Sequence, residues 1–403
     1  LIEGSSDEHV WADRYHGQLG DVFEIQDRVS RSITDALSLT LSPDVTRRLS
    51  HRPTKSPAVY ECFLRARSEM WMLSGESLDR ALEWAERGLG IASDDPELLA
   101  MKANILFQYV NISGAPPSTF SSLIAEAQDC ADRALSLRSE SAWVQWALAG
   151  IRHQSGDPEG SIRHFDLALT LEPSHADAHM MLAYQLGAVG RHLDHARLLM
   201  KRAGELDPLT PHNLGGLGWL IWFDGEFLEA TDHLKVFQDA VERGKSPFRH
   251  FPAYLHAASG NLEESIRIVD QMVIDSPDHI LTSCMRFLKH AWLGESEEAL
   301  GALTDEWLEA ARWDDIYPLY MAEGYALIGE VDLANEWLDF TIDYGIRNPD
   351  YLRYHDPFLE PLRSTTRFSE LMEKAERLSE AVPEPSGSIR LLASEDSAES
   401  RLV

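Results

Sequence analysis

The stretch from residue 149 to residue 208 decides the fold, because one pattern occurs in it twice: AGIRHQSGDPEGSIRHFDLALTLEP over 149–173 and AYQLGAVGRHLDHARLLMKRAGELDP over 183–208. Each copy places a glycine seven residues after a small residue. Glycines continue this series at steps of 34, 35, 35, 34 and 35 residues, namely Gly156, Gly190, Gly225, Gly260, Gly294 and Gly329. A fixed period of this length indicates stacked copies of one supersecondary unit.

The residues around these glycines are mostly small, as two closely packed helices of a hairpin require. The position seven residues before each glycine holds Ala149, Ala183, Gly218, Ala253, Phe287 and Ala322. Phe287 is the exception, and we expect the hairpin around it to be splayed. A second small position follows each glycine, at Ser161, Ala196, Ala230, Ser265, Ala299 and Ala334. Prolines that end helices come next, at Pro173, Pro208, Pro277 and Pro349.

This pattern resembles the tetratricopeptide repeat, a helical hairpin of about 34 residues. The best match runs through Ala149, Gly156, Ser161, Phe165, Ala168 and Pro173. The resemblance covers residues 59–345 and implies a mostly α fold, a right-handed α-solenoid of about eight hairpins over residues 51–345. One repeat cannot bury its apolar face alone, so the hairpins must share one continuous core.

Composition narrows the classes of partner. The formal net charge is -30, from 66 acidic and 36 basic residues, and such a field repels the phosphates of nucleic acids. No apolar run approaches the length of a membrane span, so this segment is not expected to insert into a bilayer. Cys62, Cys130 and Cys284 are far apart, which suits a reducing compartment such as the cytoplasm. The envelope-facing side of a membrane-anchored parent protein stays open as the alternative.

The N-terminal end, residues 1–50, differs from the array. Apolar residues recur every four positions from Ile25 to Leu41, which predicts an amphipathic helix. HVWADRY at 9–15 and DVFEIQD at 21–27 resemble the close of a TolB-like domain of bacterial signalling proteins, in which a tetratricopeptide array follows. YECFLRAR at 60–67 and YHDPFLEPL at 354–362 resemble start and end signatures of the same proteins.

This second resemblance implies a short α/β remnant before the array. It also implies an output domain upstream in the parent protein: a serine/threonine protein kinase, a nucleotide cyclase or a winged-helix DNA-binding domain. The chain begins at Leu1, and we expect its front end to lie outside this sequence.

The C-terminal end is expected to close the array. Residues 346–380 form a capping segment, with a last helix from Arg367 to Ser379 that gives the array a polar outer face. Residues 381–403 are rich in Pro, Ser and Glu, and this composition predicts a disordered acidic tail.

No motif in the sequence indicates catalysis. Gly244-Lys245-Ser246 lacks the first glycine of a phosphate loop, and the glycine-rich stretch 213–218 falls within a helix of the array. Two histidine pairs, His175 with His179 and His192 with His195, could hold a metal ion, but inter-helix histidines explain them without one. We therefore expect no catalytic residues, no metal, no cofactor and no enzymatic activity in this chain.

The concave face is the expected site of a partner. By the resemblance, the first helix of each hairpin lines this face, and its inward positions are largely aromatic. The proposed partner-binding residues are Trp143, Trp146, Tyr184, Trp219, Trp222, His250, Tyr254 and Tyr320, with His212 and Met285 at equivalent positions. Such a groove suits an apolar helix or an extended peptide. The alternative is that several of these rings are core, because periodicity cannot separate the inner face from the seam between hairpins.

Two classes of function follow. The first is an interaction or sensing scaffold that binds a protein or peptide, or its own upstream output domain. The second is a regulatory region of a kinase, cyclase or transcription regulator. A purely structural spacer is a third option, which the aromatic groove disfavours.

Overall fold

The computed structural model describes residues 14, 22–36, 56–112, 114–243 and 249–389. All regular secondary structure in these ranges is helical, as the glycine period predicts. The amphipathic segment near the N-terminus is a helix, α1 (Val22–Ala36). Most of the expected α/β remnant, residues 1–13 and 15–21, lies outside the described residues, as does Gly244-Lys245-Ser246.

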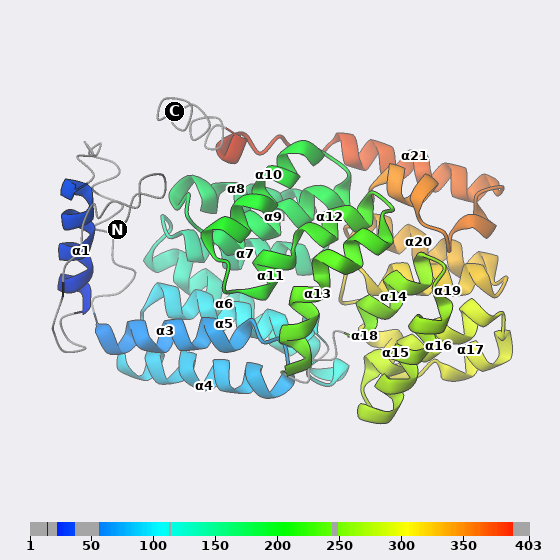
Figure 1. Cartoon of the computed structure of the whole chain (residues 1–403), viewed down its shortest axis with the longest axis horizontal. Coiled ribbons are helices and arrows are strands. Elements are labelled where there is room, and N and C mark those ends of the chain that lie inside the picture. Colours follow the sequence, from blue (N-terminus) through cyan, green and yellow to red (C-terminus); the bar gives the residue numbers. More distant parts are fainter. Residues whose placement is uncertain (1–13, 15–21, 37–55, 113, 244–248, 390–403) are drawn as a thin grey trace.

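Eight pairs of consecutive helices form hairpins in the described part of the chain (Figure 1). In the fifth hairpin the first helix is divided in two, and in the seventh a short extra helix follows the second. The pairs are α3 (Pro57–Met70) with α4 (Gly75–Ile91), α5 (Pro96–Asn111) with α6 (Phe120–Leu137), α7 (Ala142–Gln154) with α8 (Pro158–Leu171), α9 (Ala176–Val189) with α10 (Leu193–Leu206), α11 (Pro211–Gly215) and α12 (Leu217–Phe223) with α13 (Phe227–Arg243), α14 (His250–Ala258) with α15 (Leu262–Asp275), α16 (Ile280–Leu293) with α17 (Ser296–Ala302) and then α18 (Asp305–Ala310), and α19 (Tyr317–Leu327) with α20 (Val331–Tyr344).

The turn glycines work as the spacing predicts. All six have a positive φ, from +68° at Gly156 to +85° at Gly329, and this backbone conformation is strained for residues with a Cβ atom. Polar side chains then start the second helices: Asp157 accepts a hydrogen bond from Gly160 N, and Asn261 accepts one from Glu264 N. Each hairpin therefore ends one helix and begins the next within a few residues.

The small residues before the glycines are buried at helix contacts. Ala149, Ala183, Ala253 and Ala322 have no exposed surface. Phe287 is also fully buried, and its ring lies where a side chain on Gly324 of α19 would be: a Cβ atom there would come within 2.2 Å of Phe287 Cε1. A glycine in the next hairpin thus makes room for the large residue.

After α20 the chain returns along the turns of earlier hairpins, and we call residues 345–389 the return segment. Arg347 N donates a hydrogen bond to Ala188 O, and Asn348 Nδ2 donates one to Gly187 O, both at 3.0 Å. Further helices in this segment are η4 (Tyr351–His355), η5 (Glu360–Leu362) and α21 (Thr366–Glu380). The segment therefore joins the last hairpin to the middle of the array.

The start of the expected disordered tail is ordered. Gly387 N and Ser388 N donate hydrogen bonds of 2.9 and 2.7 Å to the Asp166 carboxylate of α8, and Ser388 Oγ lies 2.9 Å from His195 Nε2 of α10. Figure 1 shows this part of the chain, in red, beside α8 and α10. Composition does not indicate that this part of the chain is ordered, because its hydrogen-bond partners come from distant helices. Residues 390–403 lie outside the described residues.

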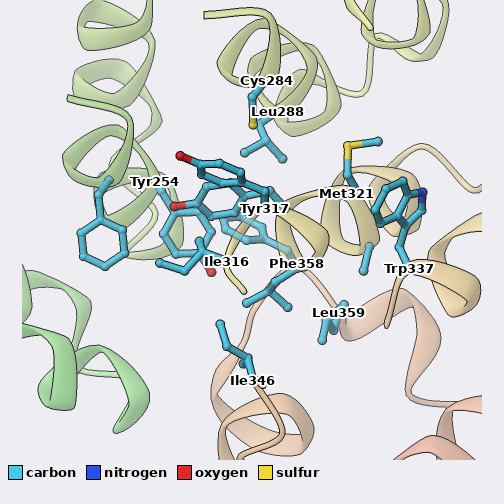
Figure 2. Packing of buried hydrophobic residues seen from close by; sticks show 14 of the residues in the cluster. Tyr254, Cys284, Leu288, Ile316, Tyr317, Met321, Trp337, Ile346, Phe358 and Leu359 are labelled. Atoms are coloured by element: carbon cyan, nitrogen blue, oxygen red, sulfur yellow. The ribbon is translucent and has the colours of Figure 1, made fainter. Parts of the chain in front are cut away.

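The largest core cluster fills the space between α12, α14, α16, α19 and the return segment (Figure 2). Tyr254, Phe358 and Leu359 meet there, although Tyr254 belongs to α14 and the other two to the return segment. Among the described helices, none is both long and apolar enough to cross a membrane.

Candidate functional site: the central pocket

A pocket of about 70 Å³ lies between the hairpins of the array, and we call it the central pocket. Its walls come from the first helices of six hairpins (the second to the sixth and the eighth), from the turn after α3 and from the loop before α19. The lining residues are Trp71, Leu73, Phe107, Gln108, Asn111, His153, Met180, Met181, Tyr184, His212, Trp219, His250, Asp314, Asp315, Ile316 and Tyr317.

The pocket exists because the last hairpin comes back to the second and third. Tyr317 Oη donates a hydrogen bond of 2.9 Å to Asn111 O, although the two residues are 206 positions apart. Tyr344 Oη donates another, of 2.7 Å, to Gln154 O, and Gln154 Nε2 donates to Trp313 O. These bonds tie α19 and α20 to α5 and α7 and so bring the 314–317 loop to the pocket.

Two adjacent carboxyls form one wall. Asp314 and Asp315 are 5% and 3% exposed. Asp314 Oδ1 accepts hydrogen bonds from Ile316 N at 2.8 Å and Tyr317 N at 3.3 Å, which starts α19, and Asp315 Oδ2 accepts one of 2.9 Å from Tyr184 Oη. Burial, and then the neighbouring Asp315 carboxyl, raise the pKa of Asp314 well above its ordinary value. These surroundings therefore favour the protonated, neutral form of Asp314.

Three histidines complete the polar lining. Gln185 Nε2 lies 2.8 Å from His153 Nδ1, and since an amide nitrogen only donates, this ring nitrogen accepts. The other ring nitrogen of His153, Nε2, lies 3.8 Å from Asp315 Oδ2. Burial lowers the pKa of His212 to about 4, so this ring is neutral near pH 7. The His250 ring packs at 6.2 Å from that of Tyr317.

A buried ion pair supports the pocket from the N-terminal side. Arg67 Nε and Nη2 donate hydrogen bonds of 2.9 and 2.8 Å to the two oxygens of Asp177. Burial opposes ionisation of Asp177, but Arg67 outweighs it and holds the pKa of this carboxyl below its ordinary value. Trp71 Nε1 donates to Asp177 Oδ2 at 3.3 Å, which fixes the indole where it lines the pocket.

The repeated unit can now be identified from the structure itself. Eight stacked hairpins, most with a left-handed glycine between their helices at a period of 34 or 35 residues, define it. The chain is a tetratricopeptide-like array. No known family profile matches it.

Comparison with known proteins gives one curated relative with clear sequence similarity. It is named as an adenylate cyclase of Rhizobium meliloti and is 30% identical over 137 residues, which are 33% of this chain. The chain matches only 23% of that protein's length.

Solved structures with a similar course of the chain have low identity. A tetratricopeptide repeat protein from Parabacteroides merdae is 13% identical, with a TM-score of 0.40 over 71% of this chain and 100% of its own. Yeast Tom70 is 16% identical, with a TM-score of 0.35 over 84% of this chain and 68% of its own. Because these scores are low, the description of the array rests on its own hairpins.

Three of the aromatic or histidine residues proposed from the sequence line the central pocket: Tyr184, Trp219 and His250. His212, at an equivalent position, lines it as well. These side chains belong to the first helices of three different hairpins, the helices that the resemblance predicts to face inward, and they meet in one pocket.

The other proposed residues lie away from the pocket lining. Trp222, Tyr254 and Tyr320 have no exposed surface, and Trp222 Nε1 donates a hydrogen bond of 2.9 Å to Tyr351 Oη of the return segment. Their burial is what the core alternative predicts. Trp143 and Trp146 pack against each other at 5.5 Å and against His175 at 4.1 and 5.8 Å. Partner binding by these five residues stays a prediction.

The sequence did not point to Asp314, Asp315, His153 or Trp71. Asp-Asp before a helix that begins with Tyr-Pro is typical of a helix start, and Asp314 does accept hydrogen bonds from Ile316 N and Tyr317 N, where α19 begins. That both carboxyls face the pocket depends on the closure of the array, which leaves no local pattern.

Three of the four histidines in these pairs have structural partners. His175 Nδ1 accepts a hydrogen bond from Ala178 N at the start of α9, and His179 Nε2 lies 2.8 Å from Pro173 O. His195 contacts Ser388, as described above. Within the described residues, no three His, Cys, Asp or Glu side chains are arranged to hold a metal ion.

Proposed function

We propose that this chain is a non-catalytic interaction scaffold and that the central pocket holds part of a protein or peptide partner. The observation that carries the proposal is the convergence of Tyr184, Trp219 and His250, from three hairpins, on one pocket with two buried carboxyls. Rigid aromatic side chains in a pocket are the usual anchors of binding energy. A pocket of about 70 Å³ suits the end of one side chain, not a helix, so the rest of the partner lies outside it.

A scaffold role fits the hydrogen bonds of the polar groups. Asp314 is used to start α19, Asp315 accepts from Tyr184, and His153 accepts from Gln185. These side chains hold one another in place, which favours recognition over proton transfer. The three cysteines are free, and we propose the cytoplasm as the compartment because free thiols persist under reducing conditions.

The test compares two tryptophans three residues apart on α12. Trp219 lines the pocket, whereas Trp222 is enclosed and hydrogen-bonded to Tyr351. We expect Trp219→Ala to weaken the binding of a peptide that the wild-type protein binds by about 2 kcal/mol or more, as at buried aromatic anchors. Trp222→Ala should instead lower the free energy of unfolding by about 3–5 kcal/mol, as for large core deletions.

Peptide titrations and urea melts of both variants measure the two quantities. If Trp219→Ala binds the peptide as tightly as the wild type, the pocket is not the partner site. An unchanged urea midpoint for Trp222→Ala would show that this ring is not part of the core.

A second candidate function is supported by the relative from Rhizobium meliloti. We infer that the array is a regulatory region of a larger signalling protein, in which a nucleotide cyclase, a protein kinase or a winged-helix domain lies upstream. The 30% identity to a protein named as an adenylate cyclase favours the cyclase. The test is cyclic-nucleotide production by the longer protein with and without Trp219→Ala. Equal activity and equal response to the retained peptide would exclude regulation through the pocket.

A further inference from the structure

The charged residues that line the central pocket have one sign. Asp314 and Asp315 are its carboxyls, and the lining includes no lysine or arginine. The nearest basic network described above, around Arg67, is already committed to Asp177 and Asp207. The lining therefore offers acidic groups, and no lysine or arginine, to whatever enters the pocket.

One of the lining histidines carries no charge near neutral pH. His212 is neutral because burial lowers its pKa to about 4. His153 Nδ1 lies 2.8 Å from Gln185 Nε2, and its Nε2 faces Asp315 Oδ2 at 3.8 Å.

Many of the other lining residues carry flat aromatic rings. The His212 ring lies 5.1 Å from Trp71 and 6.2 Å from Trp219, and Tyr184 packs edge-on against Trp219 at 5.8 Å. The faces of aromatic rings attract cations, and a guanidinium both stacks on rings and pairs with carboxylates. Rings and carboxyls in one pocket thus form a surface that favours a positively charged group over an apolar or acidic one.

We propose that the central pocket binds the positively charged end of an arginine or lysine side chain of the partner, with Asp314 and Asp315 as its ion partners. This inference rests on the proposed function and names the chemistry of the partner. A bound cation would also relieve the repulsion between the two adjacent carboxyls, because opposite charge favours their ionised form. The pocket volume of about 70 Å³ fits such a head group.

The experiment selects peptides from a randomised twelve-residue library on three purified proteins: the wild type, Asp315→Asn and Asp305→Asn. Asparagine keeps an acceptor for Tyr184 Oη, so Asp315→Asn removes charge with little change of shape. Asp305 is exposed at the start of α18 and outside the pocket lining, so its variant controls for net charge. We expect the wild type and Asp305→Asn to enrich peptides with arginine or lysine at one position, and Asp315→Asn to lose this enrichment.

A second arm leaves the protein unchanged. The best peptide is resynthesised with citrulline, which has the shape of arginine without its charge, or with norleucine in place of lysine. The dissociation constant is expected to rise at least tenfold. If peptides are retained but their anchor is apolar or acidic, or if the neutral analogue binds equally well, the cation proposal is wrong and the scaffold proposal stands. If the wild type retains no peptide, the scaffold proposal itself fails.

Discussion

At the scale of single residues, the most unusual feature outside the pocket is a pair of buried carboxyls, Glu323 of α19 and Asp356 of the return segment. Burial, and then the neighbouring Asp356 carboxyl, raise the pKa of Glu323 well above its ordinary value, and Glu323 Oε1 accepts a hydrogen bond of 2.8 Å from Tyr254 Oη. Among the described residues, Glu323 Oε2 and Asp356 Oδ2 have no hydrogen-bond partner. One proton between the two carboxyls satisfies both, so the folded state binds that proton more tightly than the unfolded chain.

This pair predicts a pH dependence of stability. Burial raises the pKa of Asp356 from 3.8 to about 6. Between these values the folded protein keeps a proton that the unfolded chain has lost, so stability is present at low pH and falls as pH rises through 6. The loss for this group is about 3 kcal/mol.

Asp356→Asn isolates the effect, because its amide oxygen can still accept from Phe358 N and Leu359 N. Urea unfolding near pH 4 and pH 7 should show that the variant gains about 3 kcal/mol relative to the wild type over this interval. Parallel pH curves for the two proteins would show that Asp356 does not titrate in this way. Glu380→Gln, an exposed change of the same charge, is the control.

At the scale of elements, the turn glycines have two different surroundings. Gly225 has a φ of +81°, and a Cβ atom there would lie 2.8 Å from His355 Nδ1 of the return segment. Gly260 has nearly the same φ, +84°, but a Cβ atom there meets nothing within 4 Å. The first glycine is therefore needed for backbone conformation and for space, and the second for conformation alone.

Alanine substitutions separate these two needs. Gly260→Ala should cost about 1–2 kcal/mol, the strain of a left-handed backbone. Gly225→Ala should cost this and about 1–3 kcal/mol more, because the return segment must shift to admit the new methyl group. Thermal or urea unfolding of both variants measures the difference. Equal costs would contradict the packing of η4 on this turn.

The elements were also the most predictable level of the structure. The turn glycines predicted the hairpin positions because a left-handed residue is required at each one, and the tightly packed alanines followed from the same spacing. Phe287 shows the limit. A large residue at a small position suggested a splayed hairpin, and no sequence pattern indicated that Gly324, in another hairpin, makes room for its ring.

At the scale of the whole molecule, hairpins of the array contact more than the hairpins next to them in the sequence. The hydrogen bond from Tyr317 to Asn111 connects parts of the chain more than 150 residues apart. The hydrogen bonds of the return segment to α8 and α9 do the same. These long-range contacts depend on the total rotation along the array, to which each hairpin adds a small rotation relative to the hairpin before it. No local sequence pattern indicates this total rotation.

The residues of the central pocket also differ in how well the sequence predicts them. Tyr184, Trp219 and His250 could be found from the sequence because each occupies an inward position of its own hairpin. Asp314 and Asp315 could not, because they reach the pocket only through the contact between the last hairpin and the second. The return segment encloses Trp222 for the same reason, and a repeat pattern cannot distinguish such a ring from one that lines a pocket.

The central claim is that a partner enters a pocket that distant hairpins build together, and amide hydrogen exchange tests it most directly. The selected peptide is added to the wild-type protein, and exchange is followed by mass spectrometry. We predict slower exchange in residues 107–111 of α5, 180–184 of α9 and 314–317 at the start of α19, all at the same peptide concentration. Slowing confined to the second helices α8, α10 and α13, or to one hairpin, would contradict the account.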